Sequence, residues 1–370
     1  MLEKVIEKPP GQRIWAVRAS SSGNFIPHFK RSRCVAIGHL DGESQSNTYP
    51  GEYFPNLGTV QNILNVKAQE TGNPSWKFRA ASHYGQVRNF IAQMKPGDLV
   101  VSMDRSKLLV GRIVGHPYIS KEAVRIEDEE GTLLSKMDFE LRRDVIWGPS
   151  FKRSSLPGVM QRSINSRQTV FCIDKYWSDI YHLIYPVFKS DDQVYFSTRI
   201  EKKEDISNFD IAKLFTFLSY IEAFSKELSS IASGNLNIND AVNMLASKNE
   251  LTMSTVAEFM SPGSVWSKFR LPDIPGKKAS TLMGLLLAYG AIFGIETPAF
   301  KMDGVIDLET RHKLLDLMID KIGSEDFTST RERLKLEVPN YNTTPLEDGS
   351  SDAQPSRHQA ELLASLSSKN

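Results

Sequence analysis

Short apolar runs separated by turn residues fill the first half of the chain, a pattern typical of a fold built from many short strands. Between these runs, Val87, Phe90, Ile91 and Met94 keep helical spacing and predict a helix over Tyr84–Met94, which ends at Lys95-Pro96-Gly97. Further helical stretches are expected at Val60–Ala68 and near residues 154–164. The predicted strands are Ile14–Ala19, Cys34–Gly38, Asp98–Asp104, Leu108–Ile119, Asp144–Trp147 and Thr169–Asp174. Because Gly111 and Gly115 permit strong bending, this half is expected to form a mixed β-barrel with inserted helices.

Longer amphipathic runs replace the short strands after Tyr185. One strand is predicted within Ser190–Ile200, followed by a polar linker. The predicted helices are Phe209–Ile231, Ile238–Ser247, Ala279–Ile295 and Leu308–Ile322, and two strands, Leu251–Phe259 and Val265–Leu271, flank a Ser-Pro-Gly-Ser turn. The chain is therefore expected to be an α+β protein with a barrel domain over residues 1–185, a linker over 186–206 and a mainly helical domain over 207–338. Residues 339–370 have the composition of a disordered tail, in which Gln359–Leu366 is expected to become helical on contact with a partner protein.

Charge divides along the same boundary. Up to Ser190, 26 Lys and Arg residues stand against 18 Asp and Glu residues, whereas after Ser190 the numbers are 19 and 26. A basic half joined to an acidic half indicates different partners for the two, and surplus positive charge attracts phosphates. The two cysteines, Cys34 and Cys172, lie inside apolar runs and indicate reduced thiols in the cytoplasm rather than a disulfide framework.

The motifs IWAVRASSSGNF, VAIGH, NFIAQMKPGDLVVSMD and LLVGRIVGHPY, together with the ending DVIWGPSFKRSSLPGV and TVFCID, resemble the PUA-like superfamily. The likeness is to the EVE-like domains that are fused to restriction endonucleases and other prokaryotic defence proteins. It covers the first half of the chain and implies a pocket for a flipped, often modified, base or for another nucleotide ligand. Family members often carry a tryptophan after the Ile-Gly pair, where this sequence has His39.

Recognition of a base needs aromatic faces, donors for base edges and cations for phosphates. The candidate stacking partners are Trp15, Trp76, Tyr84 and Trp147, and the candidate donors are Arg18, His39, Ser82 and His83. A collar of positive charge is expected from Lys30, Arg31, Arg33, Arg79, Arg88, Lys152 and Arg153. Structural roles compete with each of these assignments: Trp15 is central in a strand and suits a core, and Lys152 and Arg153 suit a solvated face.

No P-loop, dinucleotide fingerprint, nucleophile elbow or paired metal-ligand spacing occurs, so the sequence points to no catalytic centre, cofactor or metal. One alternative is a nuclease in which Asp191 or Asp192, Glu201 and Lys203 hold magnesium and polarise the attacking water.

Ala279–Ile295 is free of charge and has a small-residue side made of Gly284, Gly290 and Gly294. This pattern fits either a buried helix in an oligomeric domain or a short membrane helix, since about 20 residues usually span a bilayer. The sequence thus predicts a nucleic-acid- or nucleotide-sensing protein of a defence type that binds DNA, an oligonucleotide or a nucleotide and signals through a homo-oligomeric module. The alternatives are a nucleotide-gated pore in the inner membrane and a modification-dependent nuclease.

Overall fold

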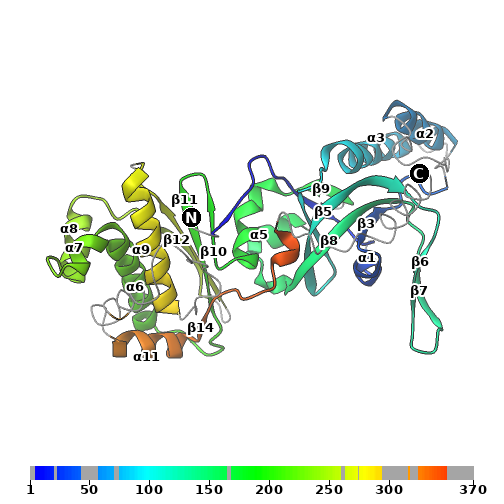
Figure 1. The fold of residues 1–370 in the computed structure, drawn as a ribbon. Helices are drawn as coiled ribbons and strands as arrows, with labels where there is room; N and C mark the ends of the chain where they lie inside the picture. The colour runs from blue at the N-terminus through cyan, green and yellow to red at the C-terminus, as the bar shows by residue number, and fades with distance from the viewer. Residues whose placement is uncertain are drawn as a thin grey trace, which may run out of the picture. The chain divides into compact units, whose positions relative to one another are not determined.

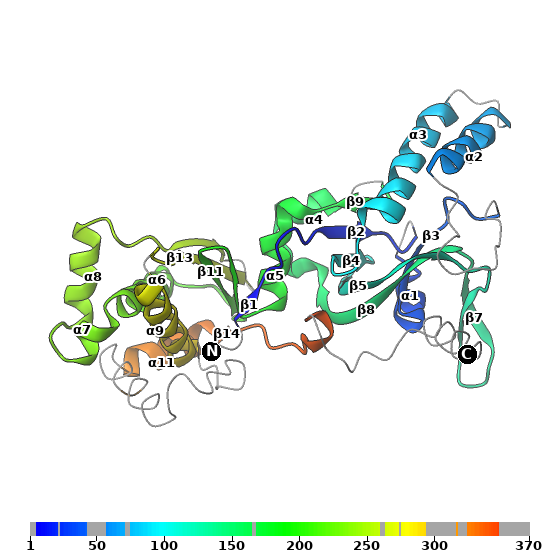
Figure 2. The same cartoon turned by 45° about the horizontal axis from the view of Figure 1, so that its top comes forward.

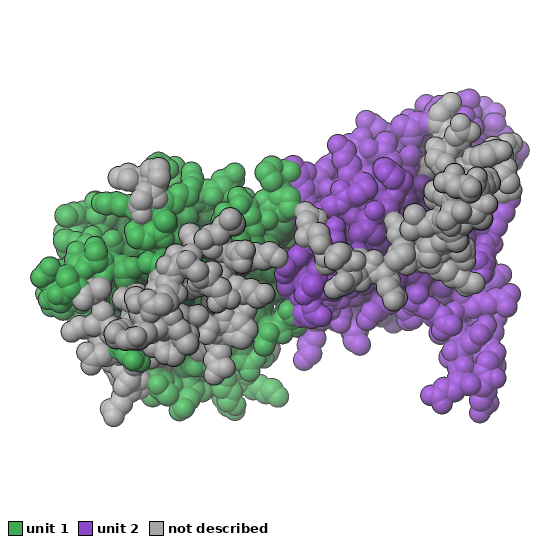
Figure 3. Space-filling model, in the orientation of Figure 1, with its two compact units in different colours: residues 1–10, 180–341 green, residues 11–179, 342–370 purple. Residues whose placement is uncertain are grey.

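The computed structural model describes residues 5–20, 23–42, 57–70, 75–164, 168–259, 263–273, 275–293, 316 and 324–347. The chain forms two compact units (Figure 3). Unit 2 holds Gly11–Asp179 and the segment that begins at Asn342, and unit 1 holds the first ten residues and Ile180–Tyr341. The sequence-based boundary at Tyr185 lies six residues beyond this division.

A six-stranded sheet forms the centre of unit 2 (Figure 1). In spatial order its strands are β3 (Cys34–Ile37), β8 (Leu141–Lys152), β5 (Lys107–Ile119), β4 (Leu99–Met103), β2 (Ile14–Val17) and β9 (Val170–Cys172). β2 and β4 run parallel, and the other neighbours are antiparallel. The apolar runs of the sequence became these strands because both of their faces are buried, as Ile14–Val17 and Cys34–Ile37 show.

The prediction of a β-barrel is wrong, because this sheet is open. Within the described residues no pairing joins the edge strands β3 and β9. The long strands β5 and β8 do bend, with register shifts between Leu109 and Gly111 and between Ile113 and Pro117. A side chain at Gly111 would meet Val145 and Trp147, so glycine there permits the close approach of β8.

Helices α1 (Ile26–Ser32), α2 (Leu57–Glu70), α3 (Ser75–Arg88) and α4 (Gly158–Ile164) belong to unit 2. The helix predicted over Tyr84–Met94 is the end of α3 plus a π-helical turn, η1 (Asn89–Gln93). The buried guanidinium of Arg143 donates to the carbonyl oxygens of Phe90 (2.9 Å), Ile91 (3.0 Å) and Gly115 (3.3 Å). It thereby satisfies acceptors that the irregular turn leaves open.

A separate two-stranded hairpin, β6 (Val124–Glu127) and β7 (Leu133–Met137), extends away from the sheet (Figures 1 and 2). Its two strands were not predicted. In β6, half-buried apolar residues alternate with exposed charged ones, but β7 begins with two exposed leucines, so the two strands together show no continuous alternation.

Unit 1 is also built on a six-stranded sheet, so it is a mixed α/β unit. Its order is β1 (Ile6–Glu7), β10 (Val187–Ser190), β11 (Gln193–Ile200), β13 (Gly263–Arg270) and β12 (Ser254–Glu258), with β14 (Leu336–Glu337) pairing with β11. The strand assigned to a linker, β11, is central and pairs with β10, β13 and β14. The predicted hairpin of β12 and β13 is confirmed.

Helices α6 (Asn208–Lys226), α7 (Leu228–Ala232), α8 (Ile238–Ser247), α9 (Pro275–Phe293) and α11 (Ser324–Leu334) complete unit 1. Helix α9, whose residues after Lys278 carry no charge, packs against α6 in the core, with Leu285, Ala288 and Tyr289 buried. A Cβ at Gly284 would lie 3.0 Å from Ser225 Cα, so this glycine serves close packing inside the chain. Gly290 is half-buried; Gly294 and the helix predicted over Leu308–Ile322 lie outside the described residues, apart from Asp316. None of the helices in the described part of the chain combines the length and the apolar character that crossing a bilayer requires.

The predicted disordered tail begins with ordered structure. Residues Thr344–Leu346 form a 3₁₀ turn, η5, in unit 2, where Leu346 is buried over Gly148 of β8. Residues 348–370, including Gln359–Leu366, lie outside the described residues.

Gly284→Leu is expected to destabilise the protein by about 1–3 kcal/mol, because the added side chain meets the α6 backbone, which cannot move aside without disturbing the core. Thermal unfolding measures the effect, and Ala279→Leu, at an exposed position of the same helix, is the matched control. Equal melting temperatures for the two variants would contradict the close helix contact.

Candidate nucleic-acid interface

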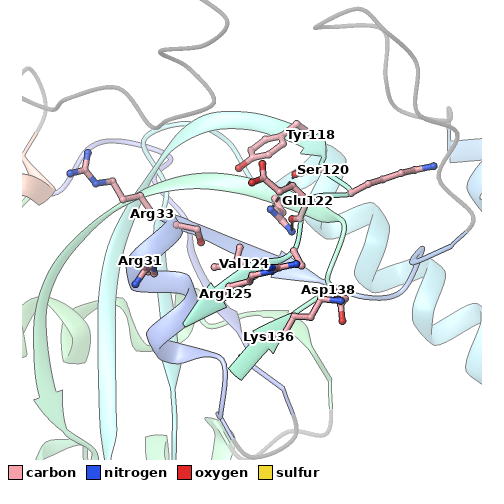
Figure 4. A pocket seen from close by; sticks show the side chains of 13 residues that line it. Arg31, Arg33, Tyr118, Ser120, Glu122, Val124, Arg125, Lys136 and Asp138 are labelled. Atoms are coloured by element: carbon pink, nitrogen blue, oxygen red, sulfur yellow. Dashed lines mark hydrogen bonds and ion pairs between the residues drawn. The ribbon is translucent and has the colours of Figure 1, made fainter. Parts of the chain in front are cut away.

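A cavity of about 910 Å³ opens in unit 2 between the end of α1, the end of β5 and the base of the β6–β7 hairpin (Figure 4). Six basic and two acidic side chains line it. The basic residues, which we call the cationic cluster, are Arg31, Arg33, Lys121, Arg125, Lys136 and Arg142. A concave surface with this excess of positive charge concentrates anions.

The turn that follows α1 places two members of the cationic cluster. The helix ends at Ser32, and Arg33 adopts a left-handed conformation with φ 51°, its backbone N–H donating to the last carbonyls of the helix. The carbonyl of Arg33 in turn accepts from Val145 of β8 at 2.8 Å. A non-glycine residue in this conformation costs about 1 kcal/mol, and such strain is concentrated at functional sites.

The base of the hairpin presents two cations side by side. Arg125 of β6 lies directly opposite Lys136 of β7 in the strand register. Like charges in this position destabilise a hairpin, and Asp138, 2.7 Å from Lys136, offsets the repulsion in part. A ligand anion between the two strands would remove the rest of the repulsion.

Arg142 and Tyr118 form the fixed floor of the cavity. The Arg142 guanidinium is buried and donates to Phe139 O (2.8 Å), Ser120 Oγ (3.2 Å) and Glu122 O, so it orders the loop that carries Lys121. Burial, then the charges of Cys34 and Asp144, raise the pKa of Tyr118, whose hydroxyl bonds to Asp144 and stays protonated. Its ring remains in the cavity lining as an aromatic surface.

The remaining members of the cationic cluster are available to a ligand. Within the described part of the chain, no hydrogen bond or ion pair occupies the side chains of Arg31, Lys121 and Arg125, all of which are exposed. These three side chains come from three different elements and face one opening, so they can contact successive phosphates of one strand.

The predicted stacking residues lie elsewhere. Trp15 is 1% exposed in the core, and its Nε1 donates to Asp98 Oδ2 at 2.9 Å, so it offers no face to a ligand. Trp147 is half-buried with Nε1 donating to Phe29 O at 2.8 Å, and Tyr84 packs against the core. The Trp76 side chain lies outside what the structure describes.

The predicted donors His39, Ser82 and His83 gather at α3, away from the cationic cluster. The two imidazole rings meet edge to face at 4.6 Å between centroids, and Ser82 Oγ accepts from Gln86 Nε2 at 3.2 Å. Burial and the neighbouring His83 lower the pKa of His39 to about 4. This ring is therefore neutral near pH 7 and cannot neutralise a phosphate.

The predicted collar of charge divides into separate groups. Arg31 and Arg33 line the cavity. Lys152 and Arg153 lie at the opposite end of β8 from Arg142, and the rise per residue of an extended strand places them about 30 Å from it along the strand. Lys30 is exposed on α1, Arg79 and Arg88 are exposed on α3, and Arg18 is half-buried just after β2; none of them lines the cavity.

Sequence reasoning missed Tyr118, Lys121, Arg125, Lys136 and Arg142. One signal was present in the sequence. A hairpin whose turn is the acidic segment that ends at Gly131 pairs Arg125 with Lys136. A cross-strand pair of like charges breaks a local rule, and such violations mark functional positions.

The residues that suggested a nuclease are not brought together. Asp191 and Asp192 precede β11 and Glu201 follows it, so about 26 Å of extended strand separates them. Asp192 is ion-paired with Lys278, and Glu201 with Arg199 at 3.3 Å. Among the residues that the structure describes, no three His, Cys, Asp or Glu side chains come together to hold a metal ion.

Comparisons with protein-family models, curated proteins and solved structures find no match for this chain. The geometry and charge of the cavity therefore indicate its function.

Arg33→Gly is expected to leave thermal stability unchanged or slightly higher while weakening DNA binding several-fold. Glycine adopts φ 51° without strain, and the loss of one cation removes one phosphate contact. Fluorescence anisotropy and thermal unfolding measure the two effects. Lys335→Gly is the matched control, because Lys335 is a basic residue with φ 48° that lies outside the cavity; equal binding losses in both variants would contradict the assignment.

Proposed function

We infer that the protein binds nucleic acid through the cationic cluster of unit 2. The observation that carries this inference is the convergence of six basic side chains around one cavity, three of them without a side-chain partner in the described part of the chain. Repulsion among so many cations destabilises the folded state unless an anion neutralises them. Nucleic acids offer such anions as the regularly spaced phosphates of their backbone.

Several phosphates suit the site better than one. The cations come from α1, the loop after β5, and both hairpin strands, and the cavity is large for a single phosphate group. Tyr118 adds an aromatic ring on which a base can stack. The resemblance of the same half of the chain to EVE-like domains supports a ligand of this class, and we propose that the unit acts as the sensor of a defence-type protein.

Salt dependence tests the inference. Fluorescence anisotropy titrations are expected to show that a 30-base-pair DNA binds most tightly, a trinucleotide less tightly and a mononucleotide most weakly. The five exposed cations of the cationic cluster predict that log K for the duplex falls against log salt with a slope of about −4.5. An affinity for duplex DNA that does not change with salt would contradict backbone recognition.

Lys136→Gln is expected to lower that slope by about 1 without destabilising the hairpin, because it removes one phosphate contact and one like-charge pair. A second like-charge pair, Lys107 opposite Lys152, lies at the far end of β8 and provides the matched control as Lys152→Gln. If the slope changed in the control and not in Lys136→Gln, the ligand would lie along the other end of β8.

A further inference from the structure

The β6–β7 hairpin carries opposite charges at its two ends. Its base holds Arg125 and Lys136, and its tip holds four consecutive exposed carboxylates, Glu127, Asp128, Glu129 and Glu130. The hairpin extends from the rest of unit 2 (Figure 2) and thus presents a positive and a negative end.

The tip is an ordered structure. Asp128 Oδ1 accepts from the backbone N–H groups of Glu130 (3.1 Å) and Thr132 (2.7 Å), and Gly131 completes the turn with φ 81°. Because Asp128 is used in this way, the acidic charge of the tip is held in a fixed position. The turn keeps the tip at the end of the hairpin, where it points away from the cavity at its own base.

Two apolar side chains lie at the start of β7, Leu133 directly opposite Glu127 and Leu134 next to it. Leu133 is 50% and Leu134 is 64% exposed, next to each other on β7. Adjacent exposed leucines on an element that extends away from a folded unit are typical of a contact surface.

We propose that two copies of this chain associate through their β6–β7 hairpins, arranged antiparallel about a two-fold axis. In this arrangement the acidic tip of each copy meets the cationic cluster of its partner, and the leucines of both copies meet near the axis. Each copy contributes the same surface, with its positive and its negative end, so the contact is isologous. Both surfaces are then occupied, and the assembly stops at a dimer. Charge complementarity sets its direction, because a parallel arrangement would place like charges together.

The dimer contact uses the same cations that hold nucleic acid. Self-association and nucleic-acid binding therefore exclude each other at this cavity, and the binding of a polyanion releases the dimer. This part of the proposal rests on the proposed function, whereas the self-association itself does not.

Sedimentation velocity with two charge-reversed variants tests the proposal. The tip variant is Glu127→Lys, Glu129→Lys and Glu130→Lys, which leaves Asp128 to hold the turn; the base variant is Arg125→Glu and Lys136→Glu. Each alone is expected to dimerise at least about tenfold more weakly than the wild type at low salt, because like charges then face each other. An equimolar mixture of the two is expected to recover a heterodimer.

The control variant reverses three exposed carboxylates elsewhere, Glu70→Lys, Asp205→Lys and Glu258→Lys, and is expected to dimerise like the wild type. Leu133→Ser with Leu134→Ser is expected to weaken the dimer without changing its charge. A monomeric wild type at low salt, or a mixture of tip and base variants that stays monomeric, would overturn the proposal.

DNA binding separates this proposal from the proposed function. The tip variant keeps the cationic cluster and is expected to bind a 30-base-pair duplex at least as tightly as the wild type. If no variant affects self-association but the base variant still loses DNA binding, the dimer proposal fails and the proposed function stands.

Discussion

Replacing Arg31 and Arg125 together by glutamate is expected to weaken the binding of duplex DNA by about a hundredfold. Each substitution removes one phosphate contact and adds a repulsive charge, and a loss of about 1.4 kcal/mol at each position gives tenfold. Both side chains are exposed and unpaired within the described residues, so the fold should tolerate the change. Anisotropy titration at a fixed salt concentration measures the loss.

Arg105→Glu with Arg270→Glu is the matched control for this double variant. Both arginines are exposed, one in unit 2 and one in unit 1, and neither lines the cavity. The net charge of the chain changes equally in the two double variants. Equal losses of affinity would mean that net charge, rather than the cavity, attracts the DNA.

Arg143→Met is expected to destabilise the protein by about 3–5 kcal/mol. The substitution fills a similar volume, but it leaves the buried carbonyl oxygens of Phe90 and Gly115 and the part-buried one of Ile91 without their donors. Burial lowers the pKa of Arg143 to about 10, so the guanidinium remains charged and donates throughout the neutral range. Calorimetric unfolding should record a fall of about 2–4 °C in melting temperature for each kcal/mol.

Arg143→Lys separates charge from hydrogen-bonding geometry. Lysine keeps the charge but cannot reach all three carbonyl oxygens from one ammonium group, so its loss of stability should be intermediate. A loss below about 1 kcal/mol for Arg143→Met would show that the π-helical turn does not depend on this side chain.

The central strands were predictable because their residues are apolar on both faces. Leu99–Met103 is buried at every position, as expected for an apolar run in a strand that is covered on both faces. The short strands β1 and β14 could not be predicted, because each has two residues and its pairing depends on β10 or β11 far away in the sequence. The barrel prediction was wrong because bending in β5 and β8 does not by itself close a sheet.

Four of the six members of the cationic cluster were not predicted, for a similar reason. Arg31 and Arg33 stood out as neighbours in the sequence. Tyr118 and Arg142 enter the cavity because β5 and β8 pair across a register shift, which places them directly opposite each other. Such convergence follows from strand register, which a single sequence specifies weakly where the side chains are polar.

Chemical footprinting of arginine side chains tests the central claim most directly. The full chain is treated with phenylglyoxal with and without a 30-base-pair duplex, and modified positions are identified by mass spectrometry. Bound DNA is expected to protect Arg31, Arg33 and Arg125 and to leave Arg105 and Arg270 reactive. Unchanged reactivity at the three cavity arginines while the DNA is bound would contradict the cationic cluster as the binding site.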